Sequence, residues 1–139
     1  MALAYSTRRV TTDIDAVFEP KSAIYSAAAR VAEELGLPED WLNDAAKGFM
    51  PGPDDDPRPL LDVRGIEVTT ASARYLLAMK LMAMPFGEDD EDIELLLKEC
   101  GIGDTDGALA VLDDVYPGHV PLPKTRFFLE QLFASMKRA

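Results

Sequence analysis

The sequence predicts an α+β fold in which short strands lie in the first half of the chain and helices fill the second half. Residues 11–18 and 60–69 are rich in β-branched and aromatic side chains, which is typical of strands. From residue 70 onward, apolar residues recur at helical spacing between glycine and proline breaks. With 139 residues, of which 47% are hydrophobic and 28% charged, the chain is expected to form one soluble globular domain over residues 1–139.

The charge and the scarcity of cysteine and histidine exclude several classes of function. A formal net charge of −11 argues against non-specific DNA binding, because phosphate contacts require clustered Lys and Arg. The only cysteine, Cys100, occupies an apolar helix position where a core thiol is expected, and the only histidine is His119. One residue of each kind gives no disulfide, no zinc constellation and little basis for nucleophile–histidine catalysis.

The sequence also gives an expectation for the location of the protein. The longest apolar run, near residues 75–84, is too short to cross a bilayer and is interrupted by Lys80. The N-terminus lacks the basic and then apolar pattern of a signal peptide. We therefore expect a cytoplasmic protein with no membrane partner.

The strand predicted at residues 11–18 carries an Asp-x-Asp pair. Alternate side chains of a strand share a face, so Asp13 and Asp15 point the same way and Ile14 points toward a core. Two carboxylates so close together repel each other unless a cation lies between them, and Mg²⁺ prefers such oxygen ligands. The alternative is an acidic pair on the solvated face of an edge strand. Arg9 adds a cation beside the pair, or belongs to a solvated basic turn.

The next segments are expected to form a helix, a short extended piece and a loop. Ser22 is a predicted cap for a helix that runs to Leu35 and stops at Gly36. Residues 40–44 follow as a second strand or an extended turn, and this piece ends in two polar residues that are candidates for substrate binding, Asn43 and Asp44. Residues 48–59 are rich in proline and form a predicted exposed loop whose acidic run, 54–56, is expected to be a solvated tip.

Residues 60–69 read as two strands joined by a turn at Arg64 and Gly65, and Asp62 on the first of them is a candidate third carboxylate. A helix then begins near residue 70 or 72 and runs to Met84. It is apolar nearly all round, which is typical of a helix buried in the centre of a domain. Lys80 is its one central charge, so its ammonium must reach solvent or meet a carboxylate or a phosphate.

Three more helices complete the expected fold. In the first of them Asp89 and Asp92 resemble a capping arrangement, while Ile93, Leu96, Leu97 and Cys100 form the inner face. Thr105 is the predicted cap of a short helix to about Tyr116. The last helix, 124–136, is expected to close the core with an apolar face made of Phe128, Leu129, Leu132, Phe133 and Met136.

Several of these segments together resemble a known family. They are RVTTDID at 9–15, WLN at 41–43, YLLAMKLMA at 75–83, Asp89 and Asp92 followed by Leu95 and Leu96, and the late pieces YP at 116–117 and FFLE at 127–130. In combination they are similar to the minimal nucleotidyltransferases of the AbiEii-like, toxin–antitoxin-associated group. The resemblance covers most of the chain, and the late pieces at 116–117 and 127–130 are similar to a bacterial branch of that group.

The resemblance implies a nucleotidyltransferase fold, with a small mixed sheet flanked by helices. It implies transfer of a nucleotide from a nucleoside triphosphate to an RNA or protein acceptor, with Mg²⁺ held by Asp13 and Asp15 and with an antitoxin or a second copy as partner. Lys80 would contact phosphate, and Asp92 with Asp89 would position Lys80 or the acceptor. Asp44 and Asp62 both remain candidates for the third acid. Phosphoryl-group transfer requires such positioning and charge neutralisation.

The sequence also departs from the family pattern. The family carries a Gly-Gly or Gly-Ser turn upstream of the Asp pair, whereas here residues 1–6 read as the last turns of a helix and no such turn precedes them. Pro85 stands where relatives tend to have Arg. Two alternatives follow: a shortened form of an active enzyme, or a catalytically inactive remnant that acts as a self-associating protein-interaction module.

Overall fold

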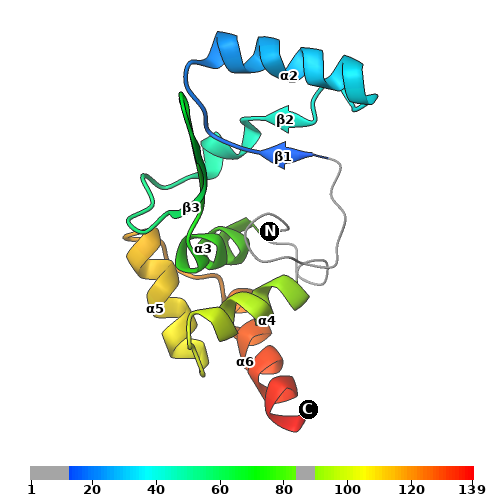
Figure 1. Ribbon diagram of the computed structural model, residues 1–139. Coiled ribbons are helices and arrows are strands. Elements are labelled where there is room, and N and C mark those ends of the chain that lie inside the picture. Colours follow the sequence, from blue (N-terminus) through cyan, green and yellow to red (C-terminus); the bar gives the residue numbers. More distant parts are fainter. Residues whose placement is uncertain (1–12, 84–89) are drawn as a thin grey trace. The chain divides into compact units, whose positions relative to one another are not determined.

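The computed structural model describes residues 13–83 and 90–139, so the expectations for residues 1–6, Arg9, Pro85 and Asp89 fall outside the described residues. The described elements follow one another as shown in Figure 1: β1 (Ile14–Asp15), α2 (Lys21–Leu35), β2 (Leu42–Asn43), the 3-10 helix η1 (Ala45–Phe49), β3 (Arg58–Val63), β4 (Ile66–Thr70), α3 (Ala73–Ala83), α4 (Asp90–Glu99), α5 (Thr105–Val115) and α6 (Pro123–Arg138). The predicted α+β class is confirmed. Within the described residues the chain divides into two compact units, 13–50 and 51–139, which are described separately below.

In the N-terminal unit, β1 and β2 form a parallel pair joined by α2, with Ile14 opposite Leu42 and Asp15 opposite Asn43. A parallel pair requires a crossover connection of this kind. Within the described residues, β1 is shorter than the predicted strand over 11–18. The reason is its partner, because β2 offers only a two-residue ladder before the chain turns into η1.

Helix α2 matches its prediction closely. It ends where Gly36 adopts a left-handed conformation with φ of 65° and donates its backbone N–H to the carbonyl of Ala32. The predicted cap at Ser22 is wrong, because the helix begins one residue earlier at Lys21 and Pro20 occupies the capping position without a side-chain hydrogen bond. The indole N–H of Trp41 donates to the carbonyl of Ala28 at 2.9 Å, which attaches the chain before β2 to the middle of α2.

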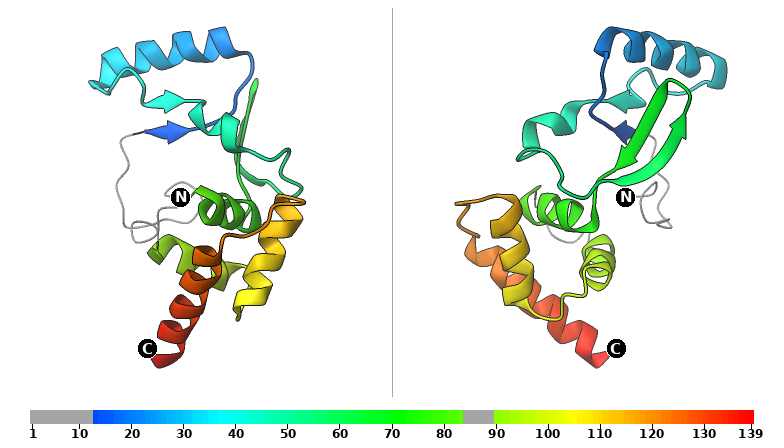
Figure 2. Two further views of the ribbon diagram at one scale, coloured as in Figure 1. Left: turned by 180° about the vertical axis from the view of Figure 1, so that it is seen from behind. Right: turned by 60° about the vertical axis from the view of Figure 1, so that its left-hand side comes forward.

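The C-terminal unit begins with an antiparallel hairpin of β3 and β4, as predicted for residues 60–69 (Figure 2, right). The connecting turn places Gly65 at φ of 87°, a region that suits glycine. Val63 lies opposite Ile66 and Asp62 opposite Glu67, and a register shift follows between Pro59 and Leu61. Because side chains alternate along each strand, the hairpin has one apolar face and one acidic face over this stretch.

Helices α3 to α6 build the hydrophobic core of the C-terminal unit (Figures 1 and 2). Helix α3 packs against α4 and α5, and α5 packs against α6. The buried residues of α3 are Tyr75, Leu77, Ala78 and Leu81, which lie on one side of the helix. Burial nearly all round was expected, but Arg74, Met82 and Ala83 are exposed. The expected inner faces of α4 and α6 are confirmed, with Ile93, Leu96, Leu97, Leu129 and Phe133 buried and Cys100, Phe128, Leu132 and Met136 packed against them.

Three further observations concern the cap of α5, the environment of Cys100 and the lengths of the described helices. The cap of α5 is Asp104 and not Thr105, because the Asp104 carboxylate accepts the backbone N–H of Gly107 at 2.7 Å. Burial raises the pKa of the Cys100 thiol, which favours the neutral form expected of a core thiol. Among the described helices, none combines the length and the apolar composition that a membrane crossing requires.

Candidate functional site

Asp15 lies on β1 and Asp13 directly precedes that strand, with the alternation of exposure predicted from the sequence. Asp13 and Asp15 are exposed, and Ile14 between them is half-buried. The backbone N–H of Ile14 donates to the carbonyl of Trp41 at 2.6 Å, and that of Ala16 donates to the carbonyl of Asn43 at 2.9 Å. The backbone on both sides of Asp15 is therefore bonded to residues 41–43, which comprise β2 and the residue before it. Two such exposed carboxylates supply the hard oxygen donors that Mg²⁺ prefers.

Asn43 and Asp44, the predicted substrate-binding residues at the end of β2, are engaged within the N-terminal unit. The Asn43 amide oxygen accepts the backbone N–H of Ala45 at 3.1 Å, and its Nδ2 donates to the carbonyl of Asp40 at 3.4 Å. Asp44 accepts hydrogen bonds from two residues of α2, at Oδ2 from Lys21 Nζ at 2.5 Å and at Oδ1 from the Tyr25 hydroxyl at 2.8 Å.

These contacts shift the pKa of all three groups, and each shift favours the form of the group that makes the hydrogen bond. The hydrogen bonds from Lys21 and Tyr25 hold the pKa of Asp44 below its ordinary value. The same contact raises the pKa of Lys21 by stabilising its ammonium form, and the hydrogen bond to Asp44 raises the pKa of Tyr25 by stabilising its hydroxyl form. Asp44 is therefore a carboxylate whose two oxygens are both directed to α2.

Lys80 and Asp92 form an ion pair between α3 and α4 in the C-terminal unit. The Lys80 Nζ and Asp92 Oδ2 atoms lie 3.2 Å apart, and the two side chains are only 18% and 10% exposed. Of the alternatives predicted for the central lysine, a carboxylate partner is the one observed. Asp92 also lies in the first turn of α4, where the helix dipole favours a negative charge. The capping arrangement expected for Asp89 with Asp92 is not tested, because Asp89 lies outside the described residues.

Asp62 lies on β3 of the hairpin, opposite Glu67 on β4, and both residues are exposed. Side chains directly opposite each other in an antiparallel pair lie on one face, and like charges in such a pair are unfavourable. Glu67 was absent from the sequence-based candidates. The two-residue turn at Arg64 and Gly65 fixes the register of the hairpin. The predicted turn was therefore enough to place Glu67 opposite Asp62.

Asp54 has a role that the sequence did not indicate. The acidic run was expected to be a solvated tip, yet the Asp54 carboxylate accepts the backbone N–H of Ser72 at 2.6 Å and the Ser72 hydroxyl at 2.8 Å. Ser72 precedes α3 and is buried, and Asp55 and Asp56 remain exposed. The expectation is therefore wrong for Asp54, because this carboxylate holds Ser72, 18 residues further along the chain, and the Ser72 hydroxyl in turn accepts the backbone N–H of Tyr75 in the first turn of α3.

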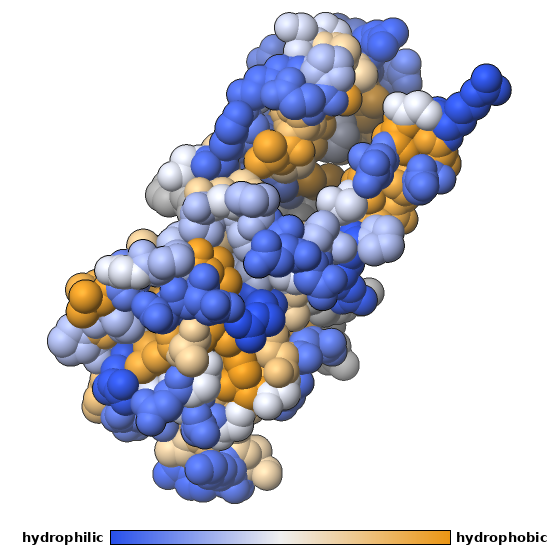
Figure 3. All heavy atoms as spheres, turned by 90° about the vertical axis from the view of Figure 1, so that its left-hand side faces the viewer, coloured by the Kyte–Doolittle hydropathy of each residue, from blue (hydrophilic) through white to orange (hydrophobic). Residues whose placement is uncertain are grey.

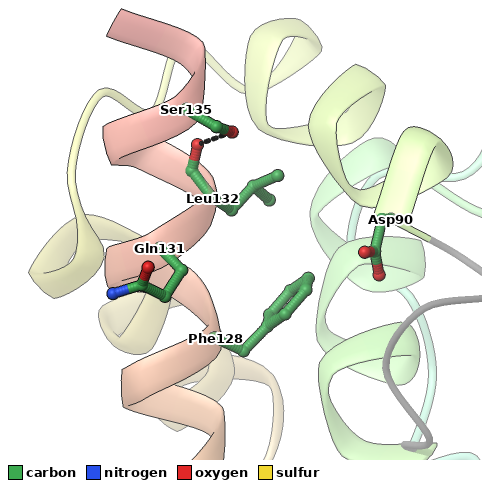
Figure 4. Close-up of a pocket in the computed structure, with 5 residues that line it drawn as sticks. All are labelled: Asp90, Phe128, Gln131, Leu132 and Ser135. Atoms are coloured by element: carbon green, nitrogen blue, oxygen red, sulfur yellow. Dashed lines mark hydrogen bonds between the residues drawn. The ribbon is translucent and has the colours of Figure 1, made fainter. Parts of the chain in front are cut away.

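Two surface hollows, each of about 220 Å³, lie away from these candidate residues. Figure 4 shows the first, where Phe128 and Leu132 of α6 face Asp90 of α4 and the Ser135 hydroxyl donates to the carbonyl of Leu132. The second lies along α2 in the N-terminal unit and is lined by Ala29, Ala32, Glu33, Leu37 and Glu39. The predicted site residues line neither hollow.

The candidate residues fall into small local groups. Asp13, Asp15, Asn43 and Asp44 belong to the N-terminal unit, and Asp62, Lys80 and Asp92 belong to the C-terminal unit. Within residues 13–83 and 90–139, no group of three or more His, Cys, Asp or Glu side chains is placed to hold a metal ion. Arg9 and Asp89 lie outside the described residues. The candidate residues thus form three local arrangements: Asp15 opposite Asn43 with Asp13 just before β1, Asp44 bonded to α2, and the Lys80–Asp92 pair.

Comparisons of this chain with protein-family models, with curated proteins and with solved structures found no match.

Proposed function

We propose that this chain is a nucleotidyltransferase that transfers a nucleotide from a nucleoside triphosphate to an RNA or protein acceptor, as a toxin of a toxin–antitoxin system. The observation that carries the proposal is the exposed pair of Asp15, on the hydrogen-bonded strand β1, and Asp13, directly before it. A ladder holds carboxylates more rigidly than a loop does, and rigidity is what a metal-assisted reaction requires of its ligands.

The donor chemistry of this pair suits Mg²⁺. Asp13 and Asp15 would hold the ion through carboxylate oxygens, and when bound it would neutralise charge on the triphosphate. Asp44 is a weaker candidate for the third acid, because both of its oxygens are bonded to Lys21 and Tyr25. Asp62, the other candidate from the sequence, lies on the hairpin of the C-terminal unit.

In this proposal Lys80 binds phosphate and Asp92 orients its ammonium group. The support is the position of the pair, because the Lys80 and Asp92 side chains are only 18% and 10% exposed and so lie in a largely apolar environment. A charge held in a region of low polarity attracts a phosphate more strongly than one in bulk water. Phosphoryl-group transfer depends on such positioned cations.

The proposal is tested by following label from the four nucleoside triphosphates, each carrying ³²P at the α-phosphate, into acid-insoluble RNA or protein. The expected result is Mg²⁺-dependent incorporation with one or more nucleotides, and its loss in Asp13→Asn and Asp15→Asn. Asp55→Asn and Asp56→Asn are matched controls, because they remove exposed acids from the loop before β3. Absence of incorporation with total bacterial RNA and protein as acceptors would contradict enzymatic activity.

A second candidate function is that of an inactive module that associates with a second copy, and the exposed apolar face of the β3–β4 hairpin favours it. Leu61, Val63 and Ile66 are 45%, 48% and 56% exposed, and the register places them on one face with Val68. Figure 3 shows hydrophobic residues open at the surface among hydrophilic ones. Large exposed apolar side chains that gather on one face are typical of interaction sites.

Light scattering after gel filtration over a range of protein concentrations separates this candidate from the first. Self-association predicts a dimer that Ile66→Lys converts to a monomer. Glu67→Lys is the control, because its side chain lies on the opposite face of the same strand and should leave the dimer intact. A monomer at every concentration would contradict self-association.

A further inference from the structure

The short strand β2 is attached to α2 at both of its ends. Before the strand, the Trp41 indole N–H donates to the carbonyl of Ala28 at 2.9 Å. After the strand, Asp44 accepts from Lys21 and Tyr25, which lie four residues apart and therefore on one face of the helix. A two-residue ladder supplies few hydrogen bonds of its own, so these side-chain contacts fix the position of β2.

Tyr25 also contacts the chain that follows β1. Its ring meets the ring of Phe18 edge to face, with the centroids 5.0 Å apart, and Phe18 lies three residues beyond Asp15. Tyr25 thus contacts the residues that follow both strands: its ring packs on Phe18 after β1, and its hydroxyl donates to Asp44 after β2. The backbone bond from Ala16 to Asn43, at 2.9 Å, lies between these two contacts.

We propose that Tyr25, together with Lys21 and Asp44, positions β1 and the Asp13 that precedes it, so that Asp13 and Asp15 can bind a divalent cation. Asp44 acts through β2 and is not itself a ligand of the ion. This inference rests on the proposed function, because it assigns the cation to the Asp13 and Asp15 pair. The group of Lys21, Tyr25 and Asp44 is called the clasp below.

The clasp also predicts what happens when Asp44 is released. If Asp44 were a ligand, removing the hydroxyl of Tyr25 or the ammonium of Lys21 would free one of its oxygens and tighten cation binding. If Asp44 positions the strand, the same changes loosen the pair and weaken binding. Removing Lys21 also makes the surroundings more negative, which by itself attracts a cation. The two roles therefore predict opposite signs for both variants.

The test is a titration of the full-length chain with Mn²⁺ alone, followed by electron paramagnetic resonance of the free ion. Tyr25→Phe keeps the ring contact with Phe18 and removes only the hydrogen bond, and Lys21→Met removes the other contact. Each is expected to weaken Mn²⁺ binding about tenfold, the lower end of what loss of a supporting hydrogen bond typically costs a metal site. Asp44→Asn, which keeps one acceptor oxygen, should lose less affinity than Asp44→Ala.

Two controls make the result specific. Arg30→Met removes one positive charge from the exposed surface of α2 outside the clasp, and it should leave Mn²⁺ binding unchanged or slightly tighter. In a background of Asp13→Asn with Asp15→Asn, the clasp variants should have no further effect on Mn²⁺ binding. A purely structural role would alter the melting temperature without this dependence on the Asp pair.

Unchanged or tighter Mn²⁺ binding in Tyr25→Phe and Lys21→Met would overturn the positioning role while leaving the proposed function standing. Absence of Mn²⁺ binding by the unaltered chain would instead overturn the assignment of the cation to Asp13 and Asp15, and the clasp inference with it. If Tyr25→Phe does not fold, Lys21→Met and Asp44→Asn carry the same comparison.

Discussion

At the scale of single residues, Lys80 and Asp92 form a largely buried ion pair, and breaking such a pair costs a large part of a protein's stability. Both side chains are largely withdrawn from water, so the buried Asp92 carboxylate depends on Lys80 for compensation of its charge. The exposed pair of Lys98 and Glu94 in the same unit provides a contrast, because its side chains are solvated and four residues apart on one helix.

Lys80→Met is expected to destabilise the protein by about 3–5 kcal/mol, because it leaves the Asp92 carboxylate buried without its partner. Lys98→Met should cost about 0.5 kcal/mol or less. Lys80→Met combined with Asp92→Leu should recover most of the loss, since it removes both charges. Urea unfolding followed by circular dichroism measures all three, and equal effects of the two lysine changes would contradict the buried pairing.

The clasp gives a second residue-scale prediction, concerning pH. The pKa of Asp44 is lowered in the folded state. The stability that the Asp44 carboxylate contributes is therefore present above its ordinary pKa of 3.8 and is lost as the pH falls through the lowered value. The pKa of Tyr25 is raised, so its contribution is present below 10.0 and is lost as pH rises through the raised value. The stability difference between the unaltered chain and Asp44→Asn should therefore stay constant between these limits.

The fluorescence of Trp41, the only tryptophan, reports unfolding of the N-terminal unit for this comparison. Urea titrations at several pH values should give a constant difference near neutrality that shrinks at both acidic and strongly alkaline pH. A difference that grew as the solution was acidified would contradict the assigned hydrogen bonds.

At the scale of elements, the start of α3 depends on a carboxylate from a distant loop. Asp54 bonds both the backbone N–H and the hydroxyl of Ser72, and the Tyr75 hydroxyl donates to the carbonyl of Gly52 in the same loop. The loop is thereby fixed to the helix that carries Lys80.

Asp54→Ala is expected to destabilise the protein by about 2 kcal/mol, which is typical for loss of hydrogen bonds to a charged group, here the two that hold Ser72 at the start of α3. Asp55→Ala is the matched control, because its side chain is exposed beside the same loop, and its effect should lie within about 0.5 kcal/mol of zero. Thermal unfolding monitored by circular dichroism measures both changes, and equal melting temperatures for the two variants would rule out the role of Asp54 in holding Ser72.

The elements that sequence alone predicted well are those with local signals. Helices α2, α3, α4 and α6 follow from apolar spacing, and the hairpin follows from the turn at Arg64 and Gly65. The alternation of Asp13, Ile14 and Asp15 is also local, so the exposed Asp pair was predictable.

The side-chain partners were not predictable in the same way. Lys80 had three possible environments, and only the packing of α4 against α3 selects Asp92. Asp44 and Asp54 each bond residues about 20 positions away, and no periodicity in the sequence encodes such pairs. A short acidic side chain can cap a helix, bond a neighbouring element or bind a metal ion, and the sequence alone does not distinguish these roles.

At the scale of the whole molecule, the prediction of one domain has a direct test in the cooperativity of unfolding. Trp41 reports the N-terminal unit, and far-ultraviolet circular dichroism is dominated by α3 to α6 of the C-terminal unit. One domain predicts that the two signals change together in urea, with coincident midpoints. Separate midpoints would show that the units unfold independently.

The net charge of −11 bears on how a triphosphate would bind. A chain with 25 acidic and 14 basic residues repels a free polyanion, so binding should require a divalent cation that cancels charge on both sides. Triphosphate without Mg²⁺, in the presence of a chelator, is accordingly expected to leave the stability of the protein unchanged.

The most direct test of the central claim is the melting temperature of the full-length chain with Mg²⁺ and each nucleoside triphosphate. At about 100 times the dissociation constant, binding to the folded state adds about 2.7 kcal/mol. That corresponds to a rise of about 5–10 °C for a chain of this size. The rise should disappear in Asp13→Asn with Asp15→Asn and persist in Asp55→Asn with Asp56→Asn. No rise with any of the four triphosphates, or a rise that survives loss of Asp13 and Asp15, would contradict the account.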